Sequence, residues 1–274
     1  MLASLIIVFR EVLEAGLITG IILAATVGVP GRGRWVAGGI GAGVAGAMVV
    51  ASCAGLISAA LEGLGQEAFT ILVLLIAVVM LSWHTIWMAS HGREMSRRMA
   101  AIGGEVKGGG RSLFALAVVI ALAVLREGSE VVLFLYGIAK SSQEAPASLL
   151  LGGAFGMAGG AATSFLLYRG LLTIPLKHLF AVTNGLVMLL AAGMAGQAAA
   201  LMASIDWLPS FGNRLWNSRA LIAENSVAGK ALHAMIGYSE QPSGIQVAAY
   251  LWTLLSLAAA SYFISQNQKP KESR

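Results

Sequence analysis

The chain has 274 residues, of which 57% are hydrophobic and 11% are charged, and its mean hydropathy is +0.79. This composition lies well outside that of soluble globular domains, so it excludes a water-soluble fold for most of the chain and indicates a membrane protein. The net charge of +5 does not indicate a nucleic-acid-binding protein, because the 18 basic residues are spread through short loops and form no basic face.

The first apolar segment covers residues 2–28 and contains Arg10, Glu11 and Glu14. A secretory signal would carry basic residues at its start and a small-residue cleavage site at its end. Nothing basic precedes Arg10, and the three charged residues lie inside the apolar run. We therefore expect this segment to be retained as the first transmembrane helix.

Six further apolar segments follow, at residues 35–61, 68–89, 112–138, 147–170, 176–203 and 245–265. Each supplies the roughly 20 mostly apolar residues that a helix needs to cross about 30 Å of hydrocarbon. The second and fifth of the seven segments are rich in glycine and alanine, which lets helices pack closely in lipid. The sequence thus predicts an all-α polytopic membrane protein with seven transmembrane helices, in which residues 1–274 form one transmembrane domain.

The distribution of lysine and arginine predicts the orientation of these helices. With the N-terminus outside, four basic residues fall in outer loops, namely Lys140, Arg214, Arg219 and Lys230. Twelve fall in inner segments, namely Arg32, Arg34, Arg93, Arg97, Arg98, Lys107, Arg111, Arg169, Lys177, Lys269, Lys271 and Arg274. Because basic residues favour the cytoplasmic side, the asymmetry predicts an N-out, C-in topology.

Residues 9–17 and 125–133 form an internal repeat, since both segments contain Arg-Glu-x-x-Glu, at an offset of 125 − 9 = 116. Three predicted spans separate the starts of the copies, so the copies cross the membrane in opposite directions, as in the inverted repeats of many secondary transporters. We expect a 3+3 inverted repeat plus one extra helix. Its parts are repeat A at about 1–90, repeat B at about 112–204, an outer loop at 205–244 and the seventh helix at 245–265.

Each Arg-Glu-x-x-Glu motif places its charges on one helix face, because the arginine and the second glutamate are four residues apart and the two glutamates are three apart. At 1.5 Å per residue, Arg10 lies about 13 Å and Arg126 about 21 Å from the start of its span. A charge at such depth costs roughly 2.5 to 3.5 kcal/mol on insertion scales, and ionisable residues inside membranes are generally functional.

Ion pairing within each helix does not account for the motifs, because one arginine cannot neutralise two carboxylates. Together the motifs carry four carboxylates and two guanidiniums, a net charge of about −2 when all are ionised. An Fe²⁺ ion would bring this charge to zero and Fe³⁺ to +1, and oxygen ligands suit hard cations. The single cysteine, Cys53, excludes a cysteine-based metal site. The motifs therefore predict transport of metal ions or protons.

The motif pair in the first and fourth of seven spans resembles the oxidase-dependent iron permease family of the iron/lead transporter superfamily. The short loops are most similar to the bacterial ferrous-iron-transport permeases of that family, and the stretches at 65–67, 83–84 and 87–88 add to the likeness. The resemblance implies a high-affinity permease that moves Fe²⁺ or Fe³⁺ into the cytoplasm across the cell (inner) membrane. It implies iron as the transported substrate and no cofactor.

The same resemblance implies roles for the motif residues. Glu11, Glu14, Glu127 and Glu130 would handle the iron, and Arg10 and Arg126 would be their electrostatic partners. It also implies a partner outside the cytoplasm, an oxidase, a peroxidase or an iron-binding protein, that presents iron to the permease.

Four further residues are candidates for the pore mouth or exit. Glu62 and Glu67 bracket an outer turn, where they would concentrate cations unless they are merely solvated. His84 and His91 lie seven residues apart on one helix face near the inner end of the third span, where they would assist metal exit or simply pack.

The outer segment 206–244 contains an apolar stripe that predicts an interfacial helix or a docking surface. The stripe consists of Leu221, Ala228, Leu232 and Met235. The segment also contains candidate external ligands, which are Asp206, Glu224, His233 and Glu240.

Two alternative functions remain at this point. A lead or manganese transporter of the same superfamily would use the same carboxylate chemistry. An intramembrane metalloprotease is disfavoured, because the chain has no His-Glu-x-x-His and the spacing of His84 and His91 does not place two ligands on one zinc ion.

Overall fold

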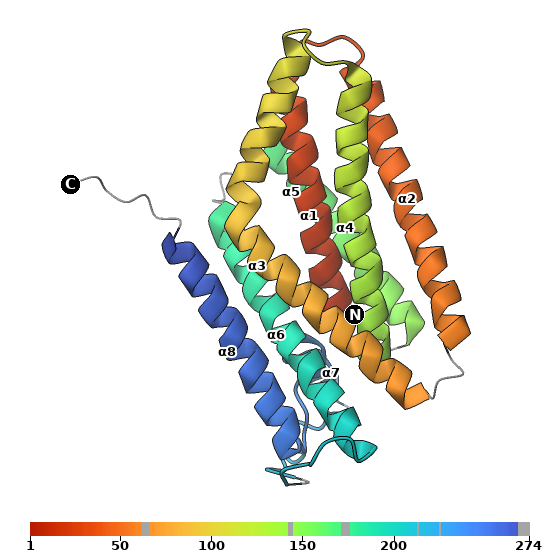
Figure 1. The fold of residues 1–274 in the computed structure, drawn as a ribbon, viewed down its shortest axis with the longest axis vertical. Helices are drawn as coiled ribbons and strands as arrows, with labels where there is room; N and C mark the ends of the chain where they lie inside the picture. The colour runs from red at the N-terminus through yellow and green to blue at the C-terminus, as the bar shows by residue number, and fades with distance from the viewer. Residues whose placement is uncertain (62–65, 142–144, 171–175, 213, 225, 268–274) are drawn as a thin grey trace, which may run out of the picture.

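The computed structural model describes residues 1–274 except 62–65, 142–144, 171–175, 213, 225 and 268–274. Within its helices it describes the backbone but not the side chains at 54–61, 66, 88–93, 96, 140–141, 176–180, 227, 230–231, 234–235 and 265–267. The regular elements in the described part of the chain are all helices (Figure 1). They are α1 (Leu2–Ala25), α2 (Arg32–Leu61), α3 (Gln66–Lys107), α4 (Leu113–Ser141), α5 (Pro146–Tyr168), α6 (Leu176–Ser204), α7 (Val227–Ile236) and α8 (Gly244–Asn267).

Apart from α3, the long helices agree to within a few residues with the segments predicted from hydropathy, and α7 is a short helix within the outer segment. Five of them contain stretches long and apolar enough to cross a membrane, at Arg32–Cys53, Glu67–Trp87, Pro146–Tyr168, Ala181–Ser204 and Gly244–Ile264. Helices α1 and α4 are similarly long, and each carries the three charged residues of its motif near its middle. The chain is therefore a multi-pass membrane protein built from helices.

Helix α3 continues well past residue 89, where the sequence predicts that the third span ends. The helix extends to Lys107. The part beyond residue 89 is held by tertiary packing, since Gly103 lies directly against Ala25 of α1 and Val106 is buried in a cluster with Ile22. Because such contacts outweigh the low helix propensity of glycine, the helix does not end where the sequence becomes charged.

Glycines allow both motif helices to pack closely against a second helix. On α5 the buried glycines recur every four residues at 152, 156 and 160, and a Cβ at Gly156 would lie 2.5 Å from a backbone carbonyl oxygen of α1. On α2 a Cβ at Gly43 would lie 2.7 Å from a backbone carbonyl oxygen of α4. The prediction that these glycine-rich helices pack closely is confirmed at these positions, and α1 pairs with α5 while α4 pairs with α2.

The remaining helices lie on the other side of α1. Helix α6 packs against α3 and α8, and α7 contacts both α6 and α1 (Figure 1). A core of buried apolar side chains joins α1, α3, α4, α6 and α8, and it includes Ile7, Leu74, Leu81, Phe134, Val187 and Leu257. This core lies beside the motif helices and fixes α3 against them.

The apolar stripe predicted for the outer segment does not lie on one helix, because Leu221 precedes α7; its side chain is 87% exposed. Helix α7 begins only after Ser226, whose side-chain oxygen accepts a hydrogen bond from the backbone N–H of Gly229 at 2.9 Å. Ala228 is exposed as well, and the side chain of Met235 lies outside the described residues. The cap at Ser226 therefore shortens the helix and removes the first residue of the stripe from it.

Candidate metal site

The first motif forms a compact, buried charge cluster on α1. The Nε atom of Arg10 lies 3.1 Å from Oε1 of Glu14, one helical turn away, and its Nη1 donates a hydrogen bond of 3.4 Å to Oε1 of Glu11. All three side chains are buried. One guanidinium thus holds two carboxylates through different nitrogens, as its planar set of donors allows.

The second motif, on α4, has a more open environment. The Nε atom of Arg126 donates a hydrogen bond of 3.2 Å to Oε1 of Glu130. The guanidinium carbon of Arg126 lies 4.1 Å from the ring centroid of Trp87, a cation–π contact. The Arg126 side chain is 36% exposed, compared with 2% for Arg10. The two motifs share a sequence but differ in their surroundings.

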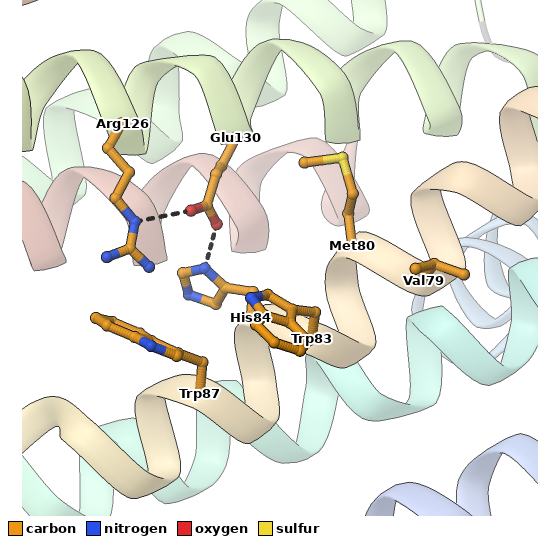
Figure 2. Close-up of a pocket in the computed structure, with 7 residues that line it drawn as sticks. All are labelled: Val79, Met80, Trp83, His84, Trp87, Arg126 and Glu130. Carbon is orange, nitrogen blue, oxygen red and sulfur yellow. Dashed lines mark hydrogen bonds and ion pairs between the residues drawn. The ribbon is translucent and has the colours of Figure 1, made fainter.

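His84 of α3 lies between the two motifs. Its Nε2 atom is 3.6 Å from Oε2 of Glu14 and 3.9 Å from Oε2 of Glu11, while its Nδ1 atom forms a close ion pair with Glu130. Figure 2 shows the imidazole extending from α3 toward the Glu130 carboxylate, with Arg126 and Trp87 beside it. Histidine from a third helix therefore connects the glutamates of α1 to those of α4.

Four of these residues bring ligand atoms together from three helices. Glu11, His84, Glu127 and Glu130 each offer an atom, and all four atoms lie within 4.8 Å of one another. A set of carboxylate oxygens and one imidazole nitrogen suits divalent transition metals. The packing of α1, α3 and α4 thus brings together side chains of the kinds that bind metal ions.

Several of the buried oxygens in this site have unused hydrogen-bonding capacity. In the described part of the chain, Oε2 of Glu11, Oε2 of Glu127 and both carboxylate oxygens of Glu14 are buried without a hydrogen-bond partner. Leaving buried carboxylate oxygens without partners is costly. With two arginines against four glutamates, the cluster also keeps a net charge of about −2 when all are ionised. A cation would satisfy both the oxygens and the charge.

A pocket of about 450 Å³ lies beside the cluster and includes part of it. Its walls come from α3 and α4, and Trp83 at its edge is 72% exposed (Figure 2). The lining residues are Val79, Met80, Trp83, His84, Trp87, Arg126 and Glu130. The pocket thus reaches the second motif and the histidine from the side of α3.

The structure brings ligand atoms of Glu11, Glu127 and Glu130 together with one of His84. Glu14 is not in this set, but its Oε2 lies 3.6 Å from Nε2 of His84. Glu67 is exposed in the first turn of α3, away from the cluster. The side chains of Glu62 and His91 lie outside the described residues. His84 lies near the end of the apolar stretch of α3, Glu67–Trp87, as the sequence predicts, and its side chain lies among the motif glutamates.

The candidate ligands of the outer segment are used in its own folding. Oε2 of Glu240 accepts a hydrogen bond of 3.0 Å from the backbone N–H of Glu224. Nδ1 of His233 is 3.3 Å from Oε1 of Glu224 and 2.7 Å from the carbonyl oxygen of Tyr238. Asp206 is exposed. These contacts join the residues that precede and follow α7 to each other and to His233 of α7.

Sequence reasoning missed the contribution of Trp87 and underrated His84. The signal for His84 was present, since a histidine inside an apolar run is an intramembrane ionisable residue. No sequence signal links Trp87 to Arg126, because the contact joins two helices. Tryptophan within a span is ordinarily read as an interface residue.

Comparison with known proteins agrees with the chemistry of the site. The sequence profile described as the iron permease FTR1 family matches residues 1–265. The protein named ferrous iron permease EfeU from Escherichia coli O6:H1 (strain CFT073) is 31% identical over 271 residues, which cover 96% of this chain and 95% of the relative. The protein of the same name from Shigella sonnei is 31% identical over 267 residues, covering 95% of each chain. No solved structure matches the chain.

These matches extend over nearly the whole chain and confirm the resemblance noted from the motifs. The relatives are named as permeases, so the chain is a transporter and not a metalloprotease or another enzyme.

Proposed function

Since the chain belongs to the iron permease FTR1 family, we propose that it moves iron with high affinity into the cytoplasm through the cluster formed by Glu11, Glu14, Glu127 and Glu130. Arg10 and Arg126 hold the carboxylates in place and limit their mutual repulsion. Iron is the transported substrate, and the mechanism needs no cofactor.

One observation carries this proposal: glutamates from two helices that carry the same motif meet near the middle of both helices. Ligand atoms of Glu11, Glu127 and Glu130 lie within 4.8 Å of one another, although 116 residues separate Glu11 from Glu127 (127 − 11 = 116). Charged residues at such depth are costly unless they share a use. A cation that crosses the membrane through this position supplies that use.

The arrangement of the helices supports an inverted repeat. Helix α1 pairs with α5, and α4 pairs with α2, so exchanging the two halves of the chain exchanges one pair for the other. Figure 1 shows α1 and α4 running in opposite directions. Both features are expected of two copies, about 1–90 and 112–204, that insert with opposite orientation. In the resulting transporter, α1 to α6 and α8 are the seven spans, with the N-terminus outside.

A partner outside the cytoplasm completes the proposal. The resemblance to oxidase-dependent permeases favours an oxidase, a peroxidase or an iron-binding protein that delivers iron. The outer segment lies on the side predicted to be outer and contacts α1 through α7. In a bacterial cell, the permease would lie in the inner membrane.

Uptake by the purified protein tests the proposed function. In proteoliposomes, the wild-type chain should accumulate radiolabelled iron, and Glu→Gln at any of the four cluster glutamates should reduce the initial rate at least tenfold, because each change removes a charge at nearly constant volume. Glu67→Gln is the matched control and should alter mainly the apparent KM, since Glu67 is exposed and outside the cluster.

Parallel assays with manganese and lead decide between iron and the other metals of the superfamily. The proposal predicts that excess manganese or lead competes weakly with iron. It would be refuted if well-folded Glu11→Gln and Glu14→Gln proteins transported iron at the wild-type rate. Preferred transport of lead or manganese would instead reassign the substrate.

A further inference from the structure

We propose that His84 is a direct ligand of the transported ion, and that its imidazole nitrogen makes the site prefer Fe²⁺ to harder cations such as Mn²⁺ and Fe³⁺. The inference rests on the proposed function, because it concerns the same ion in the same site. The Arg-Glu-x-x-Glu motifs alone supply only carboxylate oxygens, so a nitrogen ligand changes the chemical character of the site.

The first support is the position of the ring. The His84 side chain is 2% exposed, and its two nitrogens face opposite motifs, with Nε2 toward Glu11 and Glu14 and Nδ1 toward Glu130. Phe134 packs edge-on against the ring, with centroids 6.4 Å apart and an interplanar angle of 88°. Apolar packing thus holds a polar ring at the centre of the carboxylates.

The second support is the spacing around Nε2. The distances of 3.6 and 3.9 Å to the carboxylate oxygens of Glu14 and Glu11 are too long for hydrogen bonds. Two ligand atoms that each lie about 2.1 Å from one metal ion are roughly 3.0 Å apart at a right angle and about 4.2 Å apart when opposite. The observed distances fall inside this interval, so nitrogen and oxygens are separated as ligands of a shared ion would be.

The alternative is that His84 acts only as a third cation that offsets the excess carboxylate charge. A counterion gains most when each nitrogen lies close to a carboxylate. Nδ1 is in close contact with Glu130, whereas Nε2 lies 3.6 Å from Oε2 of Glu14 and 3.9 Å from Oε2 of Glu11. The longer distances from Nε2 to the oxygens of Glu11 and Glu14 leave room for a metal ion between them. A counterion role alone would not require this separation.

The chemical consequence is selectivity. Imidazole suits the later divalent metals, whereas sites made only of carboxylates suit Mg²⁺, Ca²⁺ and Mn²⁺, and affinity for a mixed site rises from Mn²⁺ through Fe²⁺ to Co²⁺. His84 can bind the ion only as a neutral imidazole, which adds no charge, so the side chains of the cluster stay at about −2 when the ion is bound and are balanced by a divalent ion and not by Fe³⁺. A fifth carboxylate at this position would reverse both preferences.

Direct detection of the nitrogen tests the assignment without relying on transport. Mn²⁺ bound to the full-length protein in detergent should show ¹⁴N modulation in pulsed electron paramagnetic resonance, and labelling all histidines with ¹⁵N should change that modulation to the ¹⁵N pattern. His84→Gln should abolish the signal. His233→Gln is the matched control and should retain it, because His233 lies in the outer segment.

Calorimetric titration provides the second readout. The wild-type protein should bind Co²⁺ at least tenfold more tightly than Mn²⁺, and His84→Asp should reduce that ratio about tenfold or more. The assignment is overturned if bound Mn²⁺ shows no nitrogen modulation in the wild-type protein, or if the ratio is unchanged in His84→Asp.

These results are separable from the proposed function. If the wild-type protein transports iron and the Glu→Gln variants do not, while no nitrogen modulation is seen, only the role of His84 is wrong. If the glutamate variants transport iron normally, the proposed function itself fails. Should His84→Gln not fold, the ¹⁵N experiment on the wild-type protein decides alone.

Discussion

The two arginines of the repeated motif differ more than their sequences indicate. Arg10 is buried and contacts two glutamates through separate nitrogens, whereas Arg126 contacts Glu130 alone and rests on the ring of Trp87. A lysine can replace a single contact and can also lie over an aromatic ring, but it cannot reproduce a planar fork. The two positions should therefore tolerate lysine differently.

We predict that Arg10→Lys lowers the initial rate of iron uptake at least tenfold, while Arg126→Lys lowers it by no more than about threefold. The pair is internally controlled, because both substitutions keep the charge and occur in the same motif. Uptake into proteoliposomes at matched protein density measures both. Equal losses would show that the exposure of Arg126 has no functional consequence.

The sequence predicts most of the site at this scale, for a physical reason. Six charged residues inside two apolar runs stand out because lipid penalises charge, so the four glutamates and two arginines can be identified from hydropathy and spacing alone. His84 and Trp87 come from a third helix. Their alignment with the motifs depends on how α3 packs, which no pattern within one helix encodes.

At the scale of elements, small residues decide which helices pair. On α2, a Cβ at Gly43 would lie 2.6 Å from Cβ of Val124 and 2.7 Å from the carbonyl oxygen of Ala121, whereas a Cβ at Gly41 would meet no atom within 4 Å. The two glycines are two residues apart on one helix but face different surroundings. They form a matched pair for testing the α2–α4 contact.

Gly43→Ala should destabilise the protein by about 1–3 kcal/mol, because the added methyl group forces α2 away from α4. Gly41→Ala should be neutral or stabilise by up to about 1 kcal/mol, since alanine favours the helix and meets nothing. Thermal unfolding in detergent measures both effects. A Gly43→Ala protein as stable as the wild type would contradict the close approach of these helices.

The extension of α3 beyond residue 89 shows where prediction from sequence fails. Hydropathy locates the lipid-crossing part of a helix, and it placed the end of this one where charged residues begin. Beyond that point the helix is maintained by contacts with residues distant in sequence, Gly103 with Ala25 and Val106 with Ile22. The other face of this part of α3 is polar and includes the Glu94–Arg98 ion pair, with an Nη2–Oε1 distance of 2.5 Å. Without knowledge of the contacts to α1, such a polar sequence predicts a loop.

For the whole molecule, the charge asymmetry of the loops predicts which face meets the cytoplasm. Cys53 is exposed on α2, so it must first be changed to serine. In that background, Gly104→Cys should react with a membrane-impermeant thiol reagent only after the inner face is made accessible, whereas Ala220→Cys should react in intact cells. Both positions are exposed. Labelling of Gly104→Cys in intact cells would invert the proposed orientation.

The two halves of the chain interlock, because each motif helix is covered by the second helix of the other half. We predict that fragments 1–109 and 110–274, cut in the turn that contains Gly109, are unstable when expressed separately and copurify when expressed together. Gel filtration in detergent and protease resistance measure the outcome. A folded, protease-resistant 1–109 fragment would show that the halves are independent.

The same interlocking has a consequence for biosynthesis. Helix α1 leaves the ribosome first, yet the glycine face that packs along it belongs to α5, which is made only after four other helices. Arg10, Glu11 and Glu14 also lack His84 until α3 follows and the glutamates of the second motif until α4 follows, in a medium that penalises each charge by roughly 2.5 to 3.5 kcal/mol. Helix α1 is thus stabilised only after α3, α4 and α5 have been made. Completion of membrane insertion therefore depends on these later helices and not on α1 alone.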